Sequence, residues 1–342
     1  MSASLPAPET RILGRTGLPV SVLGFGGAPL GDLYAQLDEA QAVATVEAAL
    51  DAGVTLIDTS PLYGHGLSEH RIGAALRRRP VRPVVISTKV GRTASPFAPH
   101  EGRSGYVGGL PHALRFDYSY DGAMRSLEQS ALRLGVDRID IVLIHDIDVW
   151  THGRETVETR FTEAMQGAYR ALEKLRAAGA VKAIGVGVNE ADMCERFARA
   201  GDFDTMLLAG RYSLLEQPAL QSFLPLAQQK GIGMMLGGVF NSGILATGPV
   251  EGAKYNYQPA PPGILAEVAA LQAVCTEHGV PLRRAALHFA LGHPAVASLV
   301  MGAVNPDEVA DQAKELATPV PAALWDDLKA RGLLGADVPV PA

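Results

Sequence analysis

A short apolar run that follows a glycine recurs along the chain, and this pattern constrains the fold more than any other feature. Gly53, Gly135, Gly179 and Gly231 each end a helix-like stretch and precede such a run, because glycine tolerates the left-handed conformation that closes a helix. The runs are continuously apolar, which is typical of strands buried on both faces. Eight candidate strands result: 20–25, 54–57, 84–88, 139–144, 183–188, 205–209, 233–236 and 298–301.

Strands that alternate with helices predict a parallel sheet with right-handed crossovers, and eight repeats favour a closed (β/α)8 TIM barrel. An open doubly wound sheet is the alternative. Residues 11–25 predict an N-terminal β-hairpin that leads into the first strand, and 282–291 predict an extra helix. A chain of 342 residues allows two domains or one large barrel. We expect a single barrel domain across 1–342, with its core at about 11–332.

Three connections are longer than a strand-to-helix link requires, namely 91–119, 146–160 and 239–262. Each follows a candidate strand, so in a barrel all three rise from the rim at the carboxyl ends of the strands. Long loops at that rim usually form the ligand pocket. We therefore expect the functional site there.

Polar side chains end three consecutive candidate strands. Asp58, Lys89 and His145 stand at these ends, and Tyr63 follows Asp58 after a short turn. Each residue alone has an ordinary explanation: a cap, a surface charge, a loop aromatic or a buried histidine with its hydrogen bonds satisfied. Because neighbouring parallel strands end at one rim, the four side chains together predict a shared site.

This combination of side chains suits proton exchange at a carbonyl or alcohol. A free tyrosine has a pKa of about 10, and a neighbouring ammonium lowers it. The aspartate would hold the lysine, and the histidine would position the reacting oxygen. We therefore expect Lys89 to lower the pKa of Tyr63. None of these groups carries electrons, so oxidation or reduction would need a hydride carrier.

The segments LIDTSPLYG, VVISTKVG and DIVLIHD resemble signature segments of the aldo-keto reductase family, and LGRTGLPVSVLGFGG resembles its N-terminal hairpin and first strand. The resemblance runs from about Arg11 to the last helix. It implies a barrel that binds a nicotinamide dinucleotide without a Rossmann fold. It also implies a catalytic tetrad in which Tyr63 transfers the proton, composed of Asp58, Tyr63, Lys89 and His145.

Residues 300–312 resemble the family segment that binds the adenosine phosphate. NADP-preferring relatives often carry a lysine near Gly302 and an arginine near Glu308, and this chain has neither. A 2′-phosphate would meet Glu308, and like charges near 4 Å repel by about 1 kcal/mol in water and about 4 kcal/mol at a partly buried site. We therefore expect NAD, with Asp311 and Gln312 near the adenine. Alternatively, Glu308 only favours the first turn of a helix that opens at Pro306.

The nicotinamide end of the cofactor site departs from the family pattern. Asn189 follows the fifth strand and is expected either to hold the nicotinamide carboxamide or to cap the next helix. Ala209 stands where a glutamine is usual. Tyr212 occupies the position whose ring stacks on the nicotinamide in the family.

Residues 115–122 and 185–190 resemble a bacterial branch of the family that oxidises sugars at the anomeric carbon or pyridoxal at its hemiacetal carbon. Since cellular NAD is mostly oxidised, we expect oxidation of an aldose of the L-fucose or D-threo type to its lactone. Pyridoxal oxidation, NADPH-dependent carbonyl reduction and a non-catalytic binding subunit are the alternatives. Aromatic rings can stack on sugar faces, so we expect substrate contacts from Trp150, His152 and Phe240.

Composition excludes several other classes. The net charge of −6 offers no basic face for nucleic acid, and no apolar run reaches the roughly 20 residues of a membrane span. The start lacks signal-peptide features, and the two cysteines are far apart, so a reducing cytoplasm is expected. The spacing of His145 and His152 with Asp146 and Asp148 matches no metal site. No coiled-coil heptads occur, so the oligomeric state is not predicted.

Overall fold

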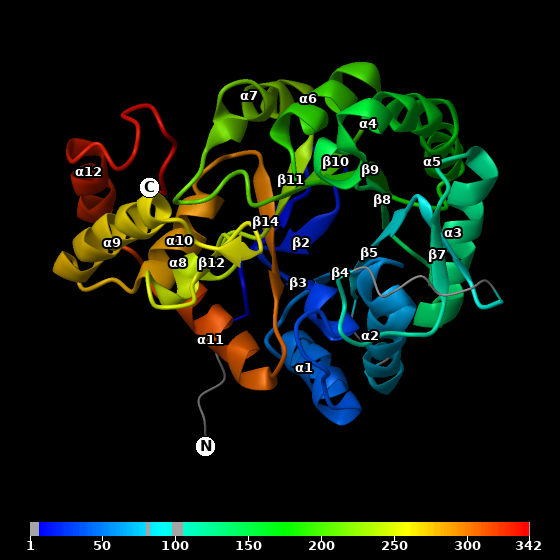
Figure 1. The fold of residues 1–342 in the computed structure, drawn as a ribbon, viewed down its shortest axis with the longest axis horizontal. Coiled ribbons are helices and arrows are strands. Elements are labelled where there is room, and N and C mark those ends of the chain that lie inside the picture. The colour runs from blue at the N-terminus through cyan, green and yellow to red at the C-terminus, as the bar shows by residue number, and fades with distance from the viewer. Residues whose placement is uncertain (1–6, 80–82, 98–104, 342) are drawn as a thin grey trace.

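The computed structural model describes residues 7–79, 83–97 and 105–341, and Figure 1 shows a central barrel surrounded by helices. Eight parallel strands pair in sequence order, and the last pairs with the first. This confirms the (β/α)8 barrel and excludes the open sheet. The barrel strands are β3 (Leu23–Gly26), β4 (Leu56–Asp58), β5 (Val85–Val90), β8 (Ile141–His145), β9 (Ala183–Val188), β10 (Thr205–Ala209), β11 (Gly233–Gly237) and β14 (Val296–Gly302).

Helices surround the barrel, and most of them share an apolar core with the outward-facing strand residues. The first begins as the sequence predicts, because the Asp38 side chain accepts a hydrogen bond from the Gln41 N–H at 3.0 Å. The predicted extra helix is present as α10. The helices are α1 (Glu39–Asp51), α2 (Leu67–Arg78), α3 (Tyr120–Leu134), α4 (Val149–Gln166), α5 (Ala168–Ala177), α6 (Ala191–Ala200), α7 (Phe223–Lys230), α8 (Ile244–Thr247), α9 (Pro262–Glu277), α10 (Leu282–Leu291), α11 (Pro306–Ala317) and α12 (Ala322–Ala330), with 3-10 turns η1 (Ala28–Gly31), η2 (Tyr63–Gly66) and η3 (Pro218–Leu220).

The predicted N-terminal hairpin closes one end of the barrel. Its strands β1 (Thr10–Ile12) and β2 (Pro19–Ser21) pair antiparallel. Leu13 and Val20 join the apolar cluster inside the barrel, and the Arg15 N–H donates to the Gly231 carbonyl at 2.9 Å. Because this end is filled, the opposite end, where the strands finish, is the open mouth.

The strand register brings the predicted site residues to that mouth. Gly302 is opposite Gly26, Gly26 is opposite Asp58, and Asp58 is opposite Ser87. The ends of β14, β3 and β4 therefore lie level with one another. In the described part of the chain, no helix combines the length and the apolar character that a membrane crossing demands.

Two of the three long connections are largely irregular, with short hairpins. The first contains β6 (Arg92–Ser95) and β7 (Ala113–Phe116), and its residues 98–104 lie outside the described chain. The third contains α8 and the hairpin of β12 (Lys254–Tyr255) and β13 (Gln258–Pro259).

The expectation of a loop at 146–160 is wrong, because α4 begins at Val149 and bends at Gly153. Asp148 caps this helix by accepting from the Thr151 N–H at 2.9 Å. Glu190, from the loop after β9, accepts from the N–H groups of Val149 and Trp150 at 3.0 Å each. The helix start therefore depends on a residue distant in sequence, which local sequence patterns do not reveal.

Candidate active site

Asp58 and Lys89 form a buried ion pair at the floor of the mouth. Lys89 Nζ lies 2.6 Å from Asp58 Oδ2 and 2.8 Å from the Thr59 carbonyl oxygen, and Ser87 donates to Asp58 Oδ1 at 2.8 Å. Asp58 and Lys89 are each 1 % exposed. Burial raises the pKa of Asp58, and the Lys89 ammonium opposes that shift. The pair that the sequence predicts therefore forms, with every oxygen of the carboxylate engaged.

A glycine two strands away in the barrel leaves room for the lysine. A Cβ atom at Gly187 would lie 3.3 Å from Lys89 Cε, closer than most such contacts. The lysine side chain therefore runs against bare backbone of β9. This explains why an inward-facing position of a buried strand carries no side chain.

Tyr63 lies at the start of η2, directly above the lysine. Lys89 Nζ is 4.8 Å from the centre of the Tyr63 ring, and the rings of Tyr63 and His145 meet edge to face at 6.0 Å. The turn is tight because Gly64 takes a left-handed conformation with φ of 61°. The structure therefore brings all four predicted side chains together.

The expected effect of Lys89 on Tyr63 is wrong for the free protein. Burial raises the pKa of Tyr63 well above its ordinary value, and the negative charges of Asp58 and Asp146 raise it further. The Lys89 charge is already balanced by Asp58 at 2.6 Å, so it does not hold a phenolate. Tyr63 is therefore a neutral phenol at neutral pH.

His145 is held as a neutral imidazole. Its Nδ1 lies 3.0 Å from Ser60 Oγ and 3.2 Å from Arg92 Nη1. A guanidinium nitrogen can only donate a hydrogen bond, so Nδ1 accepts and the proton sits on Nε2. Burial lowers the pKa of His145 well below its usual range, and the charges of Arg92 and Lys89 lower it further. The Nε2–H group can thus donate to an oxygen in the mouth.

Arg92 and Asp146 are buried beside His145, and neither was among the predicted site residues. Arg92 Nη2 lies 2.8 Å from Asp146 Oδ2, and Asp146 Oδ1 lies 3.3 Å from His145 Nε2. Both line the cavity described below. A signal was present, because Arg92 directly follows the family-like segment that contains Lys89, and Asp146 ends the family-like segment that contains His145.

A cavity of about 650 Å³ occupies the mouth above these residues. Its size is within the range of small-molecule sites. Trp150, one of the predicted substrate residues, is 55 % exposed and lies on its wall. Aromatic and apolar residues supply much of the remaining lining, including Tyr34, Leu62, Tyr106, Leu114, Phe116, Leu207 and Tyr257.

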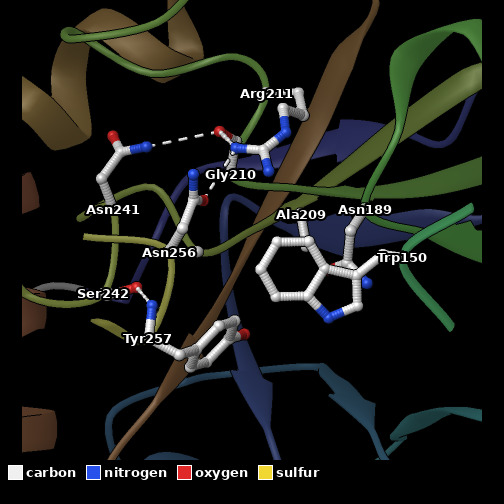
Figure 2. Close-up of a pocket in the computed structure, with 10 residues that line it drawn as sticks. Trp150, Asn189, Ala209, Gly210, Arg211, Asn241, Ser242, Asn256 and Tyr257 are labelled. Atoms are coloured by element: carbon white, nitrogen blue, oxygen red, sulfur yellow. Dashed lines mark hydrogen bonds between the residues drawn. The ribbon is translucent and has the colours of Figure 1, made fainter. Parts of the chain in front are cut away.

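A smaller cavity of about 30 Å³ adjoins it between the loops after β10 and β11 (Figure 2). Trp150, Asn189, Ala209 and Tyr257 line both cavities. Figure 2 shows Asn189 and Trp150 on one side and Tyr257 on the other. Ala209 and Gly210 lack bulky side chains, so they leave the backbone accessible from the cavity. A flat ring could therefore approach the ends of β9 and β10 closely.

Asn189 is tied to the start of α4 rather than to the helix that follows it. Its backbone N–H and its Nδ2 donate to Asp148 Oδ2 at 3.1 and 3.4 Å. The residue that precedes α6 is Glu190, which makes no capping bond to that helix. The capping alternative is therefore not what the structure contains, and the Asn189 side chain lies at both cavities.

Tyr212, His152 and Phe240 are not among the residues that line either cavity. Tyr212 is buried against Phe289 and His293, with ring centres 5.3 and 5.8 Å away, so the expected stacking on nicotinamide is wrong. His152 Nε2 lies 3.0 Å from the Tyr118 hydroxyl, behind the cavity wall.

The predicted substrate contact from Phe240 is also absent. Its ring is half-buried and packs against the apolar core of the protein. His152 lies in α4, and Tyr212 and Phe240 lie in the loops after β10 and β11, yet none of the three lines a cavity. Position after a strand was therefore a weaker guide than position at its end.

The predicted adenosine-phosphate segment lies outside the cavities, at the end of β14 and the start of α11. Gly302 is exposed, and its carbonyl accepts from Gln312 Nε2 at 2.8 Å. Glu308 accepts from the Val304 N–H and from Asn305 Nδ2, at 3.0 Å each. Glu308 therefore stabilises the first turn of α11, which was the alternative role predicted for it from the sequence. Asp311 is exposed, and its Oδ2 lies 3.8 Å from Arg283 Nη1.

Within residues 7–79, 83–97 and 105–341, no three His, Cys, Asp or Glu side chains gather in a way that could hold a metal ion. The polar groups of the mouth are instead paired with one another. The arrangement can donate or accept a proton at Tyr63 and donate a hydrogen bond from His145 to a reacting oxygen.

Comparison with known proteins agrees with this geometry. The chain is 43 % identical to pyridoxal 4-dehydrogenase of Microbacterium luteolum, over 96 % of this chain and 99 % of that protein. It is 38 % identical to D-threo-aldose 1-dehydrogenase of a Pseudomonas species, over 96 % and 97 %. A solved aldo-keto reductase from Bacillus halodurans superposes with a TM-score of 0.72 at 26 % identity, over 97 % and 98 %. Residues 22–331 match the aldo/keto reductase family model, so the chain belongs to this family of nicotinamide-dependent oxidoreductases.

Proposed function

We propose that this protein is an NAD-dependent dehydrogenase that oxidises a cyclic hemiacetal, foremost an aldose of the L-fucose or D-threo type, to its lactone. The observation that carries the proposal is the convergence of Tyr63 and the neutral His145 on one cavity, above the buried Lys89–Asp58 pair. The similarity to an aldose 1-dehydrogenase over nearly the whole chain supports the substrate class.

Each side chain has a defined task in this reaction. His145 donates its Nε2–H to the hemiacetal oxygen and thereby orients the substrate hydroxyl. Tyr63, in its phenolate form, takes the hydroxyl proton at its Oη. Lys89 and Asp58 form the rigid charged floor beneath the phenol. Bound oxidised nicotinamide supplies the hydride acceptor and a positive charge that favours the phenolate form.

The cofactor would lie along the rim from the cavity toward α11. Asn189 would hold the carboxamide beside Ala209, and Gly302 would allow the phosphate-bearing part to pass close to the backbone. Gln312 and Asp311 would lie near the adenine. Glu308 is fixed by two hydrogen bonds, so its charge cannot move away from a 2′-phosphate without losing them. This supports the preference for NAD over NADP.

Pyridoxal is the second candidate substrate, because the relative with 43 % identity is a pyridoxal 4-dehydrogenase. The aromatic lining of the cavity, including Tyr106 and Phe116, would suit a pyridine ring as well as a sugar face. Both substrates present a cyclic hemiacetal hydroxyl, so the same residues would carry out the same step.

Initial-rate measurements with NAD and with NADP test the proposal. The panel contains L-fucose, D-arabinose, L-galactose, D-glucose and pyridoxal, and NADH formation is followed by absorbance. We expect turnover with NAD and an L-fucose-type sugar. Turnover with pyridoxal alone would show that pyridoxal, not an aldose, is the substrate. Turnover only in the reducing direction with NADPH would overturn the proposal.

Tyr63→Phe removes the proton acceptor and should reduce turnover by roughly 100-fold to 10,000-fold while NAD still binds. Tyr212→Phe is a matched control, because the buried Tyr212 hydroxyl finds no hydrogen-bond partner among the described residues. That variant should keep full activity. Retained turnover in Tyr63→Phe would contradict the assignment.

A further inference from the structure

We propose that Arg92, anchored by Asp146, is a positioning residue that holds His145 in the neutral form with its proton on Nε2. The proposal rests on the function proposed above, in which that Nε2–H orients the substrate hydroxyl. It extends the site from four residues to six, and the two added residues never exchange a proton with the substrate.

The first observation is the geometry of the arginine fork. Arg92 Nη1 lies 3.2 Å from His145 Nδ1, and Arg92 Nη2 lies 2.8 Å from Asp146 Oδ2. A guanidinium nitrogen can only donate, so this contact is possible only while Nδ1 is unprotonated. The fork therefore disfavours both the charged imidazolium and the other neutral tautomer.

The second observation is that Arg92 is fixed in place from several directions. Ser126 of α3 donates to its backbone carbonyl at 2.8 Å, and its guanidinium lies over the Phe116 ring at 4.5 Å from the ring centre. Gly91 turns the chain at the end of β5 with φ of 110°, and a Cβ there would collide with Tyr118. An arginine without a role in the site would not need to be held by these contacts.

Asp146 is held in an unusual conformation that returns its carboxylate to the mouth. Its φ is 54°, in the left-handed region that aspartate tolerates better than most residues. Its N–H donates to the Gly187 carbonyl at 2.9 Å. The carboxylate thus balances the Arg92 charge and lies 3.3 Å from His145 Nε2.

The charges that face His145 predict different effects for replacing the two residues. Lys89 and Arg92 disfavour the imidazolium, whereas Asp146 alone would favour it, and Tyr63 opposite the ring is neutral. Arg92→Gln leaves the Asp146 carboxylate unbalanced beside the imidazole, so protonation of His145 should move to higher pH. Asp146→Asn leaves Arg92 in place, so no such move is expected.

The test is nitrogen NMR of histidines in the free protein, with the His145 signals assigned by their loss in His145→Gln. In the native protein we expect the pattern of a neutral Nε2–H imidazole down to below pH 6. In Arg92→Gln the titration should move up by at least one pH unit, and adding Asp146→Asn should move it back down. An Nδ1–H tautomer in the native protein, or no movement in Arg92→Gln, would overturn the proposal.

Kinetics provide a second readout. The acid limb of the pH profile of kcat/KM should move with the NMR titration, and the double variant should recover activity at pH 7 relative to Arg92→Gln alone. A purely structural arginine predicts a loss that is independent of pH and worse in the double variant.

Arg71→Gln is the matched control, because Arg71 forms another buried pair, with Asp32 at 2.7 Å. It should lower stability without moving the His145 titration. The NMR result needs neither substrate nor cofactor, so it stands or fails separately from the proposed function.

Discussion

The two sides of the barrel mouth are built in different ways. On the side of β4, β5 and β8, charged groups are buried and paired with one another, as in Lys89–Asp58 and Arg92–Asp146. On the side of β10, β11 and β14, small residues such as Ala209 and Gly302 stand at the strand ends. The first side fixes side chains, and the second leaves backbone accessible.

This difference matches the tasks that the proposed function gives the two sides. A buried charge without a partner costs several kcal/mol, so the groups on the first side hold one another in a single geometry that suits proton transfer. In the proposed function the second side receives the dinucleotide, which is long and needs a shallow, open path, and small residues would provide one. We therefore expect changes on the first side to affect stability and turnover, and changes on the second to affect mainly cofactor affinity.

Asp58→Asn should show the largest effect. It removes the negative partner of a lysine that is 1 % exposed, and breaking a buried pair from one side costs roughly 3–5 kcal/mol of unfolding free energy. Turnover should fall with it. Urea unfolding measures the change. Asp311→Asn is the control on the other side, where the pair with Arg283 spans 3.8 Å at the surface, so its unfolding free energy should stay within about 0.5 kcal/mol of native. Equal losses in the two variants would remove the contrast between the two sides.

The pH dependence of oxidation should identify the first side as the source of proton transfer. The raised pKa of Tyr63 keeps the phenol protonated at pH 7, and oxidation needs it deprotonated. The phenolate fraction therefore grows as pH rises, and kcat/KM for oxidation should increase between pH 7 and 9 by as much as about tenfold per unit. Reduction should lack this increase. A flat profile for oxidation would show that Tyr63 is already ionised or is not the acceptor.

The sequence predicts the barrel and the four central residues for a common physical reason. The strands are largely apolar and buried, and Asp58, Lys89 and His145 are the last polar positions before the chain leaves the sheet. Parallel pairing in chain order is then enough to bring them together. The side chain direction at a strand end is set by the strand itself, so position in the sequence translates directly into position in space.

Residues beyond the strand ends were harder to predict because single backbone angles decide where they point. Arg92 reaches His145 only through the left-handed Gly91, and Asp146 only through its own positive φ. Tyr212 follows the left-handed Gly210 and turns into the core instead. The pKa of Tyr63 was mispredicted because the sequence does not reveal how deeply the phenol is buried, and burial is the main cause of the raised pKa.

Glu308 tests the second side. Glu308→Gln removes the charge that would oppose a 2′-phosphate and retains an oxygen that can accept a hydrogen bond from Val304 or Asn305. Relief of about 1 kcal/mol or more corresponds to a KM for NADP that is roughly fivefold lower or better, with turnover and unfolding free energy nearly unchanged. Asp307→Asn, in the same helical turn and exposed, controls for charge alone. An equal gain from Asp307→Asn would mean that the effect is one of general charge.

Trp150 should give the smallest effect, because it belongs to neither of the buried pairs Lys89–Asp58 and Arg92–Asp146. Its indole meets the Tyr257 ring edge to face at 6.3 Å, and both line the cavity. Trp150→Phe keeps an aromatic face but loses area, and an aromatic contact is worth about 0.5–1.5 kcal/mol. The KM for the substrate should therefore rise by roughly two- to tenfold at constant kcat, with no change in the KM for NAD. Phe240→Leu is the control, because that ring packs on the core and should leave KM unchanged. If Trp150→Phe lowers kcat instead, the indole acts on the reacting geometry and belongs with the β4, β5 and β8 side of the mouth.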